Sequence, residues 1–175
     1  MGILDLDHAS LQRFVADAAR RWLAHDGLWF QAVERAYGLD AAVALDIEAW
    51  REFAPLEARR ILSFLGLAPG GGLDALEQAL PFRLYALINR QEILRPSPGV
   101  LVFRMNSCRV QEARRRKGLA EFACRPVGLV EYEGFAQAID PRIQVRCLGC
   151  PPDPHPTEWF CAWEFTLSGC TEVRA

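Results

Sequence analysis

Long apolar runs are missing from this sequence of 175 residues. No stretch of about 18 or more apolar residues occurs, so we expect no membrane-spanning helix. The first residues also lack the basic stretch followed by an apolar stretch that marks a secretion signal. Both absences predict a cytoplasmic protein. In a reducing cytoplasm, the six cysteines are expected to be free or metal-bound rather than paired in disulfides.

A strong charge of one sign is also missing, because the formal net charge is only -2. Acidic residues are in excess in residues 1–80 and basic residues in residues 81–175, where they concentrate between Arg109 and Lys117. A basic run of this kind can contact phosphate. It is also typical of the solvated face of a helix whose last turn favours cations. The negative net charge argues against a nucleic-acid partner.

The first 80 residues are expected to form a helical subdomain. Apolar residues recur there at spacings of three and four, which is the helical period. Gly27, Gly38 and Pro55 divide this pattern into four short helices. An aromatic stripe on these helices either lines a ligand pocket or, as is more common for such spacing, belongs to the core; it consists of Trp22, Trp29, Phe30, Trp50 and Phe53.

Residues 81–175 are expected to form an α+β subdomain that packs with residues 1–80 into one compact unit. Strand-like and helix-like segments follow one another here in the order ββααββ. This order predicts a four-stranded antiparallel sheet with helices on one face, behind the N-terminal helical subdomain. The expected strands are 83–94, 99–106, 142–148 and 158–167, and the expected helices are 108–117 and 126–139.

Cysteines gather in one stretch of the second half, which includes the pair Cys147-Leu-Gly-Cys150. If the strands and helices alternate in direction and each spans the sheet, Cys124 lies at the same end as Cys147, Cys150 and Cys161. The same tracing leaves Cys108 at the opposite end. Cys170 belongs to the C-terminal tail.

Four thiols at one end of a sheet match the ligand set of Zn(II) or of an iron–sulfur cluster. We therefore predict a metal site next to a pocket for a small molecule. Its ligands are expected to be Cys124, Cys147, Cys150 and Cys161. A second C-x2-C pair is missing, so the match to a ribbon-type zinc site is incomplete.

His155 offers an alternative ligand set with Cys147, Cys150 and Cys161, spaced as C-x2-C-x4-H-x5-C. This spacing resembles a zinc knuckle, which would imply nucleic-acid binding, although the last interval is one residue longer than in a knuckle. The prolines around His155 stiffen the loop, which also departs from a compact knuckle.

Two further readings of the thiols need no metal. Cys124 stands just before a predicted helix and beside Arg125, and both features stabilise a thiolate, so it is the best candidate for a catalytic nucleophile. Alternatively, Cys147 and Cys161 are inward-facing strand residues that pack as small hydrophobic side chains. The sequence leaves these alternatives open.

A resemblance to known proteins covers about residues 80–168. It is carried by Met105-Asn-Ser-Cys108, Phe122-Ala-Cys124-Arg-Pro, Ile139-Asp-Pro-Arg142, Cys147-Leu-Gly-Cys-Pro-Pro-Asp153 and Trp159-Phe-Cys161-Ala-Trp163. The stretch resembles a family of uncharacterised cytosolic proteins that are common in anaerobic bacteria and archaea. More distantly it is similar to the L-2-amino-thiazoline-4-carboxylate hydrolase-like family. That similarity implies a thiol-dependent hydrolase of C–N or C–S bonds, with no catalytic residue carried over.

Overall fold

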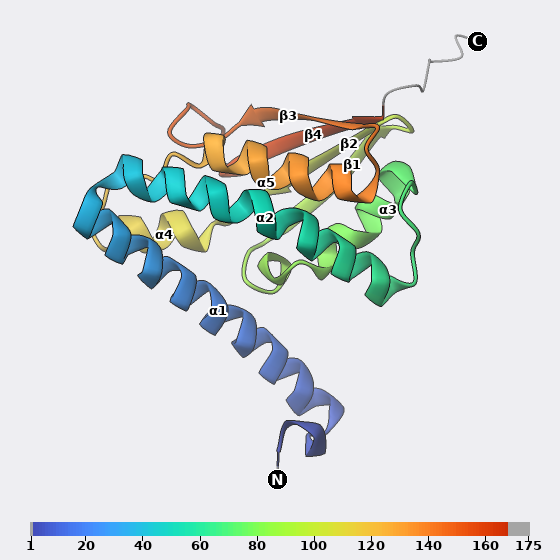
Figure 1. Cartoon of the computed structure of the whole chain (residues 1–175), viewed down its shortest axis with the longest axis horizontal. Helices are drawn as coiled ribbons and strands as arrows, with labels where there is room; N and C mark the ends of the chain where they lie inside the picture. Colours follow the sequence, from blue (N-terminus) through green and yellow to red (C-terminus); the bar gives the residue numbers. More distant parts are fainter. Residues whose placement is uncertain (1, 168–175) are drawn as a thin grey trace.

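The computed structural model describes residues 2–167 and shows an α+β fold, which confirms the predicted class (Figure 1). Two long helices come first, and a four-stranded sheet with two inserted helices follows. The main elements are α1 (His8–Tyr37), α2 (Leu39–Leu65), α3 (Gly72–Ala79), β1 (Gln91–Ser97), β2 (Val100–Met105), α4 (Arg109–Arg116), α5 (Cys124–Ile139), β3 (Ile143–Gly149) and β4 (Cys161–Leu167). Short 3-10 helices are η1 (Ile3–Asp5), η2 (Leu80–Phe82) and η3 (Leu84–Leu87).

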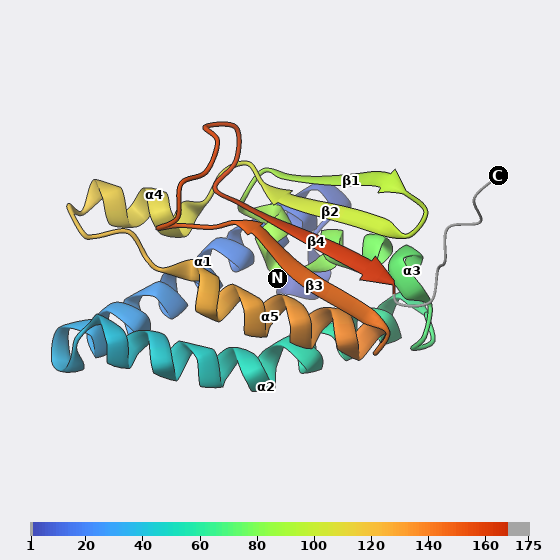
Figure 2. The same cartoon turned by 90° about the horizontal axis from the view of Figure 1, so that it is seen from above.

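The sheet has the strand order β1-β2-β4-β3, and all neighbouring strands are antiparallel. Helix α5 packs beneath it and α2 packs along α5, so the helices cover one face as predicted (Figure 2). On the other face, opposite charges pair across strands, such as Arg146 with Glu164 at 2.8 Å. This polar face explains why a carboxylate is tolerated among the apolar residues of β4.

The core lies between the covered face of the sheet and the helices α5, α2 and α3. Alternate residues of β2 and β4 point into it because side chains of a strand alternate between faces. Leu101 and Phe103 of β2 and Trp163 and Phe165 of β4 are all buried. One hydrophobic cluster joins them to residues of α2, so residues from both predicted subdomains share a core. The division at residue 80 stays a prediction.

The prediction of four short N-terminal helices is wrong, because α1 continues through Gly27 and α2 continues through Pro55. Of the three predicted breaks, Gly38 ends a helix as expected, with a φ of 87° that favours glycine. Pro55 is accommodated where α2 packs on α5. Gly134 of α5 faces this proline, since a Cβ at Gly134 would lie 3.4 Å from the Cδ of Pro55, in van der Waals contact.

The predicted first strand, 83–94, is also wrong in its first part. Residues Leu84–Leu87 form η3, and β1 begins only at Gln91. The side chain of Arg83 holds this segment, because its guanidinium forms ion pairs with Glu57 of α2 and Glu131 of α5. A tertiary contact thus overrides the β propensity of the apolar residues.

The predicted direction of β2 is wrong, and with it the placement of Cys108. Met105, at the end of β2, pairs with Cys161 at the start of β4, so the chain reaches Cys108 at the same end of the sheet. The placement of Cys108 was wrong because the basic helix does not span the sheet. Helix α4 has eight residues and lies beyond the end of the strands, so the chain does not return along the sheet before α5 (Figure 2).

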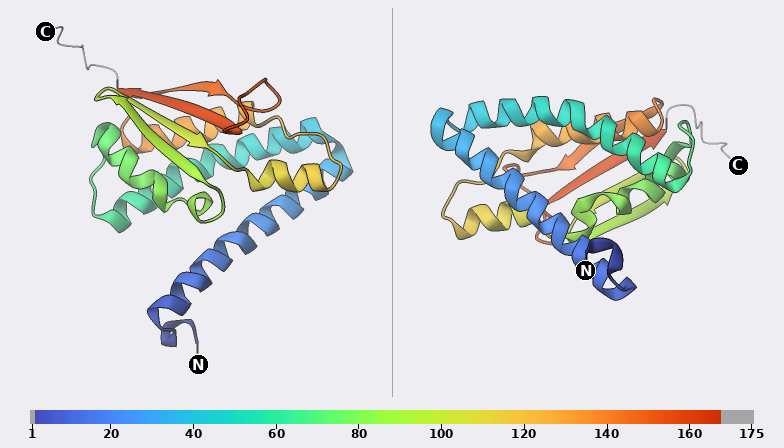
Figure 3. Two further views of the ribbon diagram at one scale, coloured as in Figure 1. Left: turned by 180° about the vertical axis from the view of Figure 1, so that it is seen from behind. Right: turned by 60° about the horizontal axis from the view of Figure 1, so that its bottom comes forward.

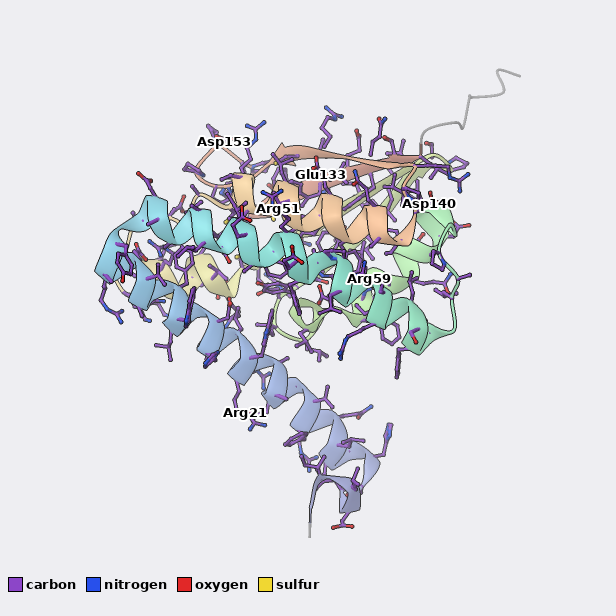
Figure 4. All side chains as sticks on the ribbon, in the orientation of Figure 1. Arg21, Arg51, Arg59, Glu133, Asp140 and Asp153 are labelled. Carbon is purple, nitrogen blue, oxygen red and sulfur yellow. The ribbon has the colours of Figure 1, made fainter. Side chains whose placement is uncertain are left out.

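Helix α1 leaves the body of the molecule, and its N-terminal half extends away from it (Figures 1 and 3). Arg21 lies on this helix, apart from the sheet (Figure 4). Only Ala19 and Val33 of α1 are buried. In residues 2–167, no helix combines the length and the apolar character needed to cross a membrane.

Candidate functional site

A cavity of about 400 Å³ lies where α1, α2, α4 and α5 meet the end of the sheet. Its wall contains four thiols, from Cys108, Cys124, Cys150 and Cys161. Aromatic and apolar side chains make up much of the remaining wall. Among them are Trp50, Tyr85, Met105, Phe122, Val127, Tyr132 and Trp163.

The thiols meet because four different chain segments reach the same end of the sheet. Cys161 begins β4, and Cys150 follows directly on β3 after an irregularity between Cys147 and Gly149. Cys124 is the first residue of α5, and its backbone N–H donates to the carbonyl of Pro151 at 3.1 Å. Cys108 stands directly before α4.

An ion pair fixes the loop between β3 and β4 against the start of α5. Arg125 Nη1 lies 3.0 Å from Asp153 Oδ2, and Asp153 is seen at the outer edge of this loop (Figure 4). Together with the Cys124–Pro151 hydrogen bond, this contact ties the segment that carries Cys150 to the helix that carries Cys124. The proximity of these two thiols is therefore set by backbone and charge contacts on both sides.

The surroundings of Cys150, Cys108 and Cys147 favour the neutral form of these three thiols. Cys150 is fully buried, and its neighbours Cys124 and Cys161, together with burial, raise the pKa of its thiol well above the ordinary value. Burial raises the pKa of Cys108 to about 12. Burial also raises the pKa of Cys147. Negative charge on several of these sulfurs at once would be unfavourable unless a ligand supplied positive charge.

Gln111 of α4 orients Cys124. Its side chain is fully buried, and its Nε2 donates to the Sγ of Cys124 at 2.9 Å and to the carbonyl of Phe122 at 2.7 Å. Its Oε1 accepts from the N–H of Phe122 at 3.1 Å. The Cys124 thiol in turn donates to the carbonyl of Phe122 at 3.3 Å, so contacts on two sides fix the position of this sulfur. Gln111 was not predicted as a site residue, because in the sequence it lies within the basic run.

The structure brings together three of the four predicted metal ligands, Cys124, Cys150 and Cys161, and adds Cys108 to them. Cys147 lies on β3 opposite Trp163 and is not among the described residues that line the cavity. Within residues 2–167, no three or more His, Cys, Asp or Glu side chains are grouped so that they could hold a metal ion. The thiols are neighbours but do not form a ready-made metal centre.

His155, the alternative ligand, lies on the loop between β3 and β4. Its ring stacks on Trp159 with 6.1 Å between centroids and lies 5.9 Å from the ring of Phe160. Its Nδ1 is 2.9 Å from the carbonyl oxygen of Pro156. Among the described residues, the lining of the cavity does not include it. These contacts support a packing role for this ring.

A buried charge network adjoins the cavity. Arg83 Nε lies 2.9 Å from Glu57 Oε2, and Arg83 Nη2 lies 2.7 Å from Glu131 Oε1. The guanidinium is also surrounded by rings, with its carbon 4.8 Å from the centroid of Phe135 and 5.6 Å from that of Trp50. Glu131 lines the cavity, and burial raises the pKa of its carboxyl despite the arginine.

Two further acids line the cavity, Asp26 of α1 and Asp46 of α2. Burial, with the negative charges of Asp26 and Glu131, raises the pKa of Asp46 to about 7. Burial also raises the pKa of Asp26. Solvent still reaches this exposed residue, but the walls of the cavity surround its carboxyl. Neither acid was predicted as a site residue, because in the sequence both have the pattern of ordinary surface residues of helices.

Trp163 of β4 contributes a polar group with no partner. Its indole lines the cavity and is 1% exposed, and its buried Nε1 has no hydrogen-bond partner in the described part of the chain. Gly128 of α5 makes room for this ring, since a Cβ there would lie 2.5 Å from its Cζ2. Tyr132 packs against the same indole, with 4.7 Å between centroids.

The basic run of α4 is partly engaged within the protein. Arg114 is buried and binds Glu34 of α1 through both terminal nitrogens, at 2.7 and 2.8 Å. Arg115 pairs with Glu121 at 2.6 Å. Lys117 donates to the Oε1 of Gln31 at 2.7 Å. These contacts attach α4 to α1 and close one side of the cavity.

Comparison with protein-family models shows that residues 4–167 match the model of DUF6125, a family of unknown function. A comparison with curated proteins finds no match. The matched range includes all four thiols of the cavity and the three acids near them.

Proposed function

The chain belongs to DUF6125, a family of unknown function, and we propose that it binds a small molecule in the cavity and holds it against the four thiols. The observation that carries this proposal is the cavity itself, which places Cys108, Cys124, Cys150 and Cys161 in one wall. Small-molecule sites are typically concave and mostly apolar, with a few polar groups that orient the ligand. The size and the wall of this cavity have that character.

Cys124 is proposed as the thiol that reacts with or most closely contacts the ligand. It is held by Gln111 at 2.9 Å and stands at the first turn of α5. A hydrogen-bond donor to sulfur and a position at the start of a helix are typical of thiols that act as nucleophiles. A thiol-dependent hydrolase is the enzymatic form of this proposal.

Blocking the mouth of the cavity tests the binding proposal. The probe is 1-aminoanthracene, a neutral aromatic molecule whose fluorescence rises in apolar surroundings. Ala24→Trp, which adds a large side chain to the cavity wall on α1, is expected to weaken dye binding by about tenfold or more, a change of about 1.4 kcal/mol.

Ala36→Trp is the matched control for this experiment. Ala36 lies on the same helix, is exposed, and is not among the described residues that line the cavity. This variant should bind the dye as the unchanged protein does. Equal weakening in both variants, or dye binding that neither variant changes, would contradict the proposed site.

Thiol alkylation tests the special position of Cys124. With iodoacetamide at neutral pH, we expect Cys124 to be modified first, before Cys150, which is buried, and Cys108, whose pKa is raised to about 12. Gln111→Leu should slow the reaction at Cys124 by removing the amide donor to its sulfur. Peptide mass spectrometry over time measures both rates. Uniform and slow modification of all thiols, seen only after unfolding, would count against a reactive Cys124.

Metal binding is the second candidate function. It is favoured by the contact of Cys150 with Cys124 and Cys161, since sulfurs that raise one another's pKa are stabilised by a bound cation. The donor set suits Zn(II) or an iron–sulfur cluster. However, within residues 2–167 no three or more His, Cys, Asp or Glu side chains are grouped so that they could hold a metal ion. Stoichiometric zinc or iron in protein purified without oxygen would support this candidate, and its absence would remove it.

A further inference from the structure

Part of the cavity wall carries carboxylates that the protein leaves without a counter-charge. Asp26, Asp46 and Glu131 come from three helices, α1, α2 and α5, and all three line the cavity. Glu131 has an arginine partner, Arg83, which it shares with Glu57. Within residues 2–167, neither Asp26 nor Asp46 forms an ion pair with a Lys or Arg side chain.

The electrostatic surroundings of Asp46 are negative. The charges that act on it are those of Asp26 and Glu131, which raise its pKa to about 7 together with burial, while a hydrogen bond with Trp50 acts in the opposite sense. Burial raises the pKa of Asp26, and the neighbouring His25 acts in the opposite sense. Five basic side chains, from Arg20, Arg109, Arg114, Arg116 and Lys117, also line the cavity, but none of them is among the groups that shift these two carboxyls. A cation that binds in this part of the cavity would therefore reduce the repulsion among these carboxylates.

A second, independent feature of the same cavity is Trp163. Its buried Nε1–H has no partner in the described structure, and buried donors are nearly always paired in proteins. The indole forms part of the cavity wall. This N–H is shielded from solvent in this structure, and a ligand acceptor that reached it would satisfy it.

We propose that the ligand of this cavity carries a protonated amine that binds Asp46 and Asp26, and an acceptor for the Nε1–H of Trp163. This inference rests on the proposed small-molecule function and names the chemical class of its ligand. The aromatic side chains Trp50 and Tyr85, which stack with 6.1 Å between their centroids, supply apolar wall next to the acids. The ligand is thus a small organic amine whose other end reaches the thiols.

Displacement of 1-aminoanthracene by three phenyl compounds of similar size tests the charge preference. Benzylamine is a cation at pH 7.5, benzyl alcohol is neutral, and benzoate is an anion. We expect benzylamine to displace the dye at a concentration about tenfold lower than benzyl alcohol, and benzoate to be the weakest. Asp46→Asn should abolish the advantage of benzylamine and leave displacement by benzyl alcohol unchanged.

Glu48→Gln is the matched control, because Glu48 is an exposed acid on the same helix that pairs with Arg51. This variant should keep the preference for benzylamine. Between pH 6 and 8 the preference should grow in the unchanged protein, because Asp46 loses its proton over that range.

The outcomes separate this inference from the function on which it rests. If the dye binds but benzylamine and benzyl alcohol displace it equally, or if Asp46→Asn changes nothing, the amine inference is overturned while the binding cavity stands. If neither the dye nor any probe binds, both are overturned.

Discussion

Replacing Arg83 with methionine is expected to lower the free energy of unfolding by about 3–5 kcal/mol. The guanidinium is 2% exposed and pairs with both Glu57 and Glu131. Removing it leaves two buried carboxylates without a counter-charge. The free-energy penalty of these unpaired charges is larger than the net stabilisation that the intact ion pairs provide. It also removes the contacts with the surrounding rings, such as Phe135 at 4.8 Å. Urea denaturation at pH 7.5 measures the change.

Arg104→Met is the control for this prediction. Arg104 pairs with Glu92 at 3.3 Å across the solvent-facing side of the sheet, and both side chains are more than one third exposed. Such pairs contribute about 0–1 kcal/mol, so this variant should unfold almost as the unchanged protein does. The account of the buried network fails if Arg83→Met loses no more stability than Arg104→Met.

Replacing Asp46 with asparagine is expected to make the ligand-free protein more stable at pH 8, by about 1–3 kcal/mol. The raised pKa of about 7 means that the folded state keeps the proton of Asp46 at pH values where the unfolded state, with an ordinary value of 3.8, has lost it. The folded state then binds more protons than the unfolded one, so stability falls as pH rises from about 4 to 7. Above pH 7, Asp46 is ionised in the folded state, and the free energy of unfolding is lowered by the full amount. The neutral amide that replaces this carboxyl does not ionise, so the variant avoids this loss. The expected gain in stability is smaller than the full pKa shift of Asp46 implies, because this side chain is only partly buried.

Other charged groups act on Asp46 in this region, namely Asp26 of α1 and Glu131 of α5, and both are still present in the variant. At pH 4 the two proteins should differ little, because Asp46 is then largely neutral in both states. Thermal unfolding across this pH range measures the difference. Glu48→Gln should change stability by no more than about 0.5 kcal/mol at any pH. A loss of stability on Asp46→Asn at pH 8 would contradict the strained state of this carboxyl.

Together, the two Asp46 experiments describe a residue that lowers stability and is expected to favour ligand binding. Functional sites commonly retain groups that the folded state would otherwise disfavour. Arg83 has the opposite character, since it neutralises Glu131 at the edge of the cavity and holds η3 in place. The fold thus compensates one carboxylate of the cavity and leaves the other two available.

The α+β class and the order of strands and helices could be predicted from hydrophobic periodicity, because each element of the second half has its own pattern. The lengths of the first helices could not. Gly27 has open space around its Cα and is tolerated within α1. Pro55 packs against Gly134 on α5, a contact between residues distant in the sequence.

The thiol cluster was predicted in part, and the acids were not predicted at all. Cys150 and Cys161 follow from the strand pattern, and Cys124 follows from the start of α5. Cys108 was placed wrongly because local patterns do not show whether a short helix crosses a sheet or lies beyond it. Asp26 and Asp46 acquire meaning only when α1 and α2 meet around the cavity, which no local spacing indicates.

Protection of Cys124 by a bound probe tests most directly the claim that a ligand in the cavity lies against the thiols. The rate of iodoacetamide modification is measured for each cysteine with and without saturating 1-aminoanthracene. We predict that the dye slows the reaction at Cys124 by about tenfold and leaves the rate at Cys147, which does not line the described cavity, unchanged. Dye that binds without slowing Cys124, or that slows both cysteines alike, would contradict the account.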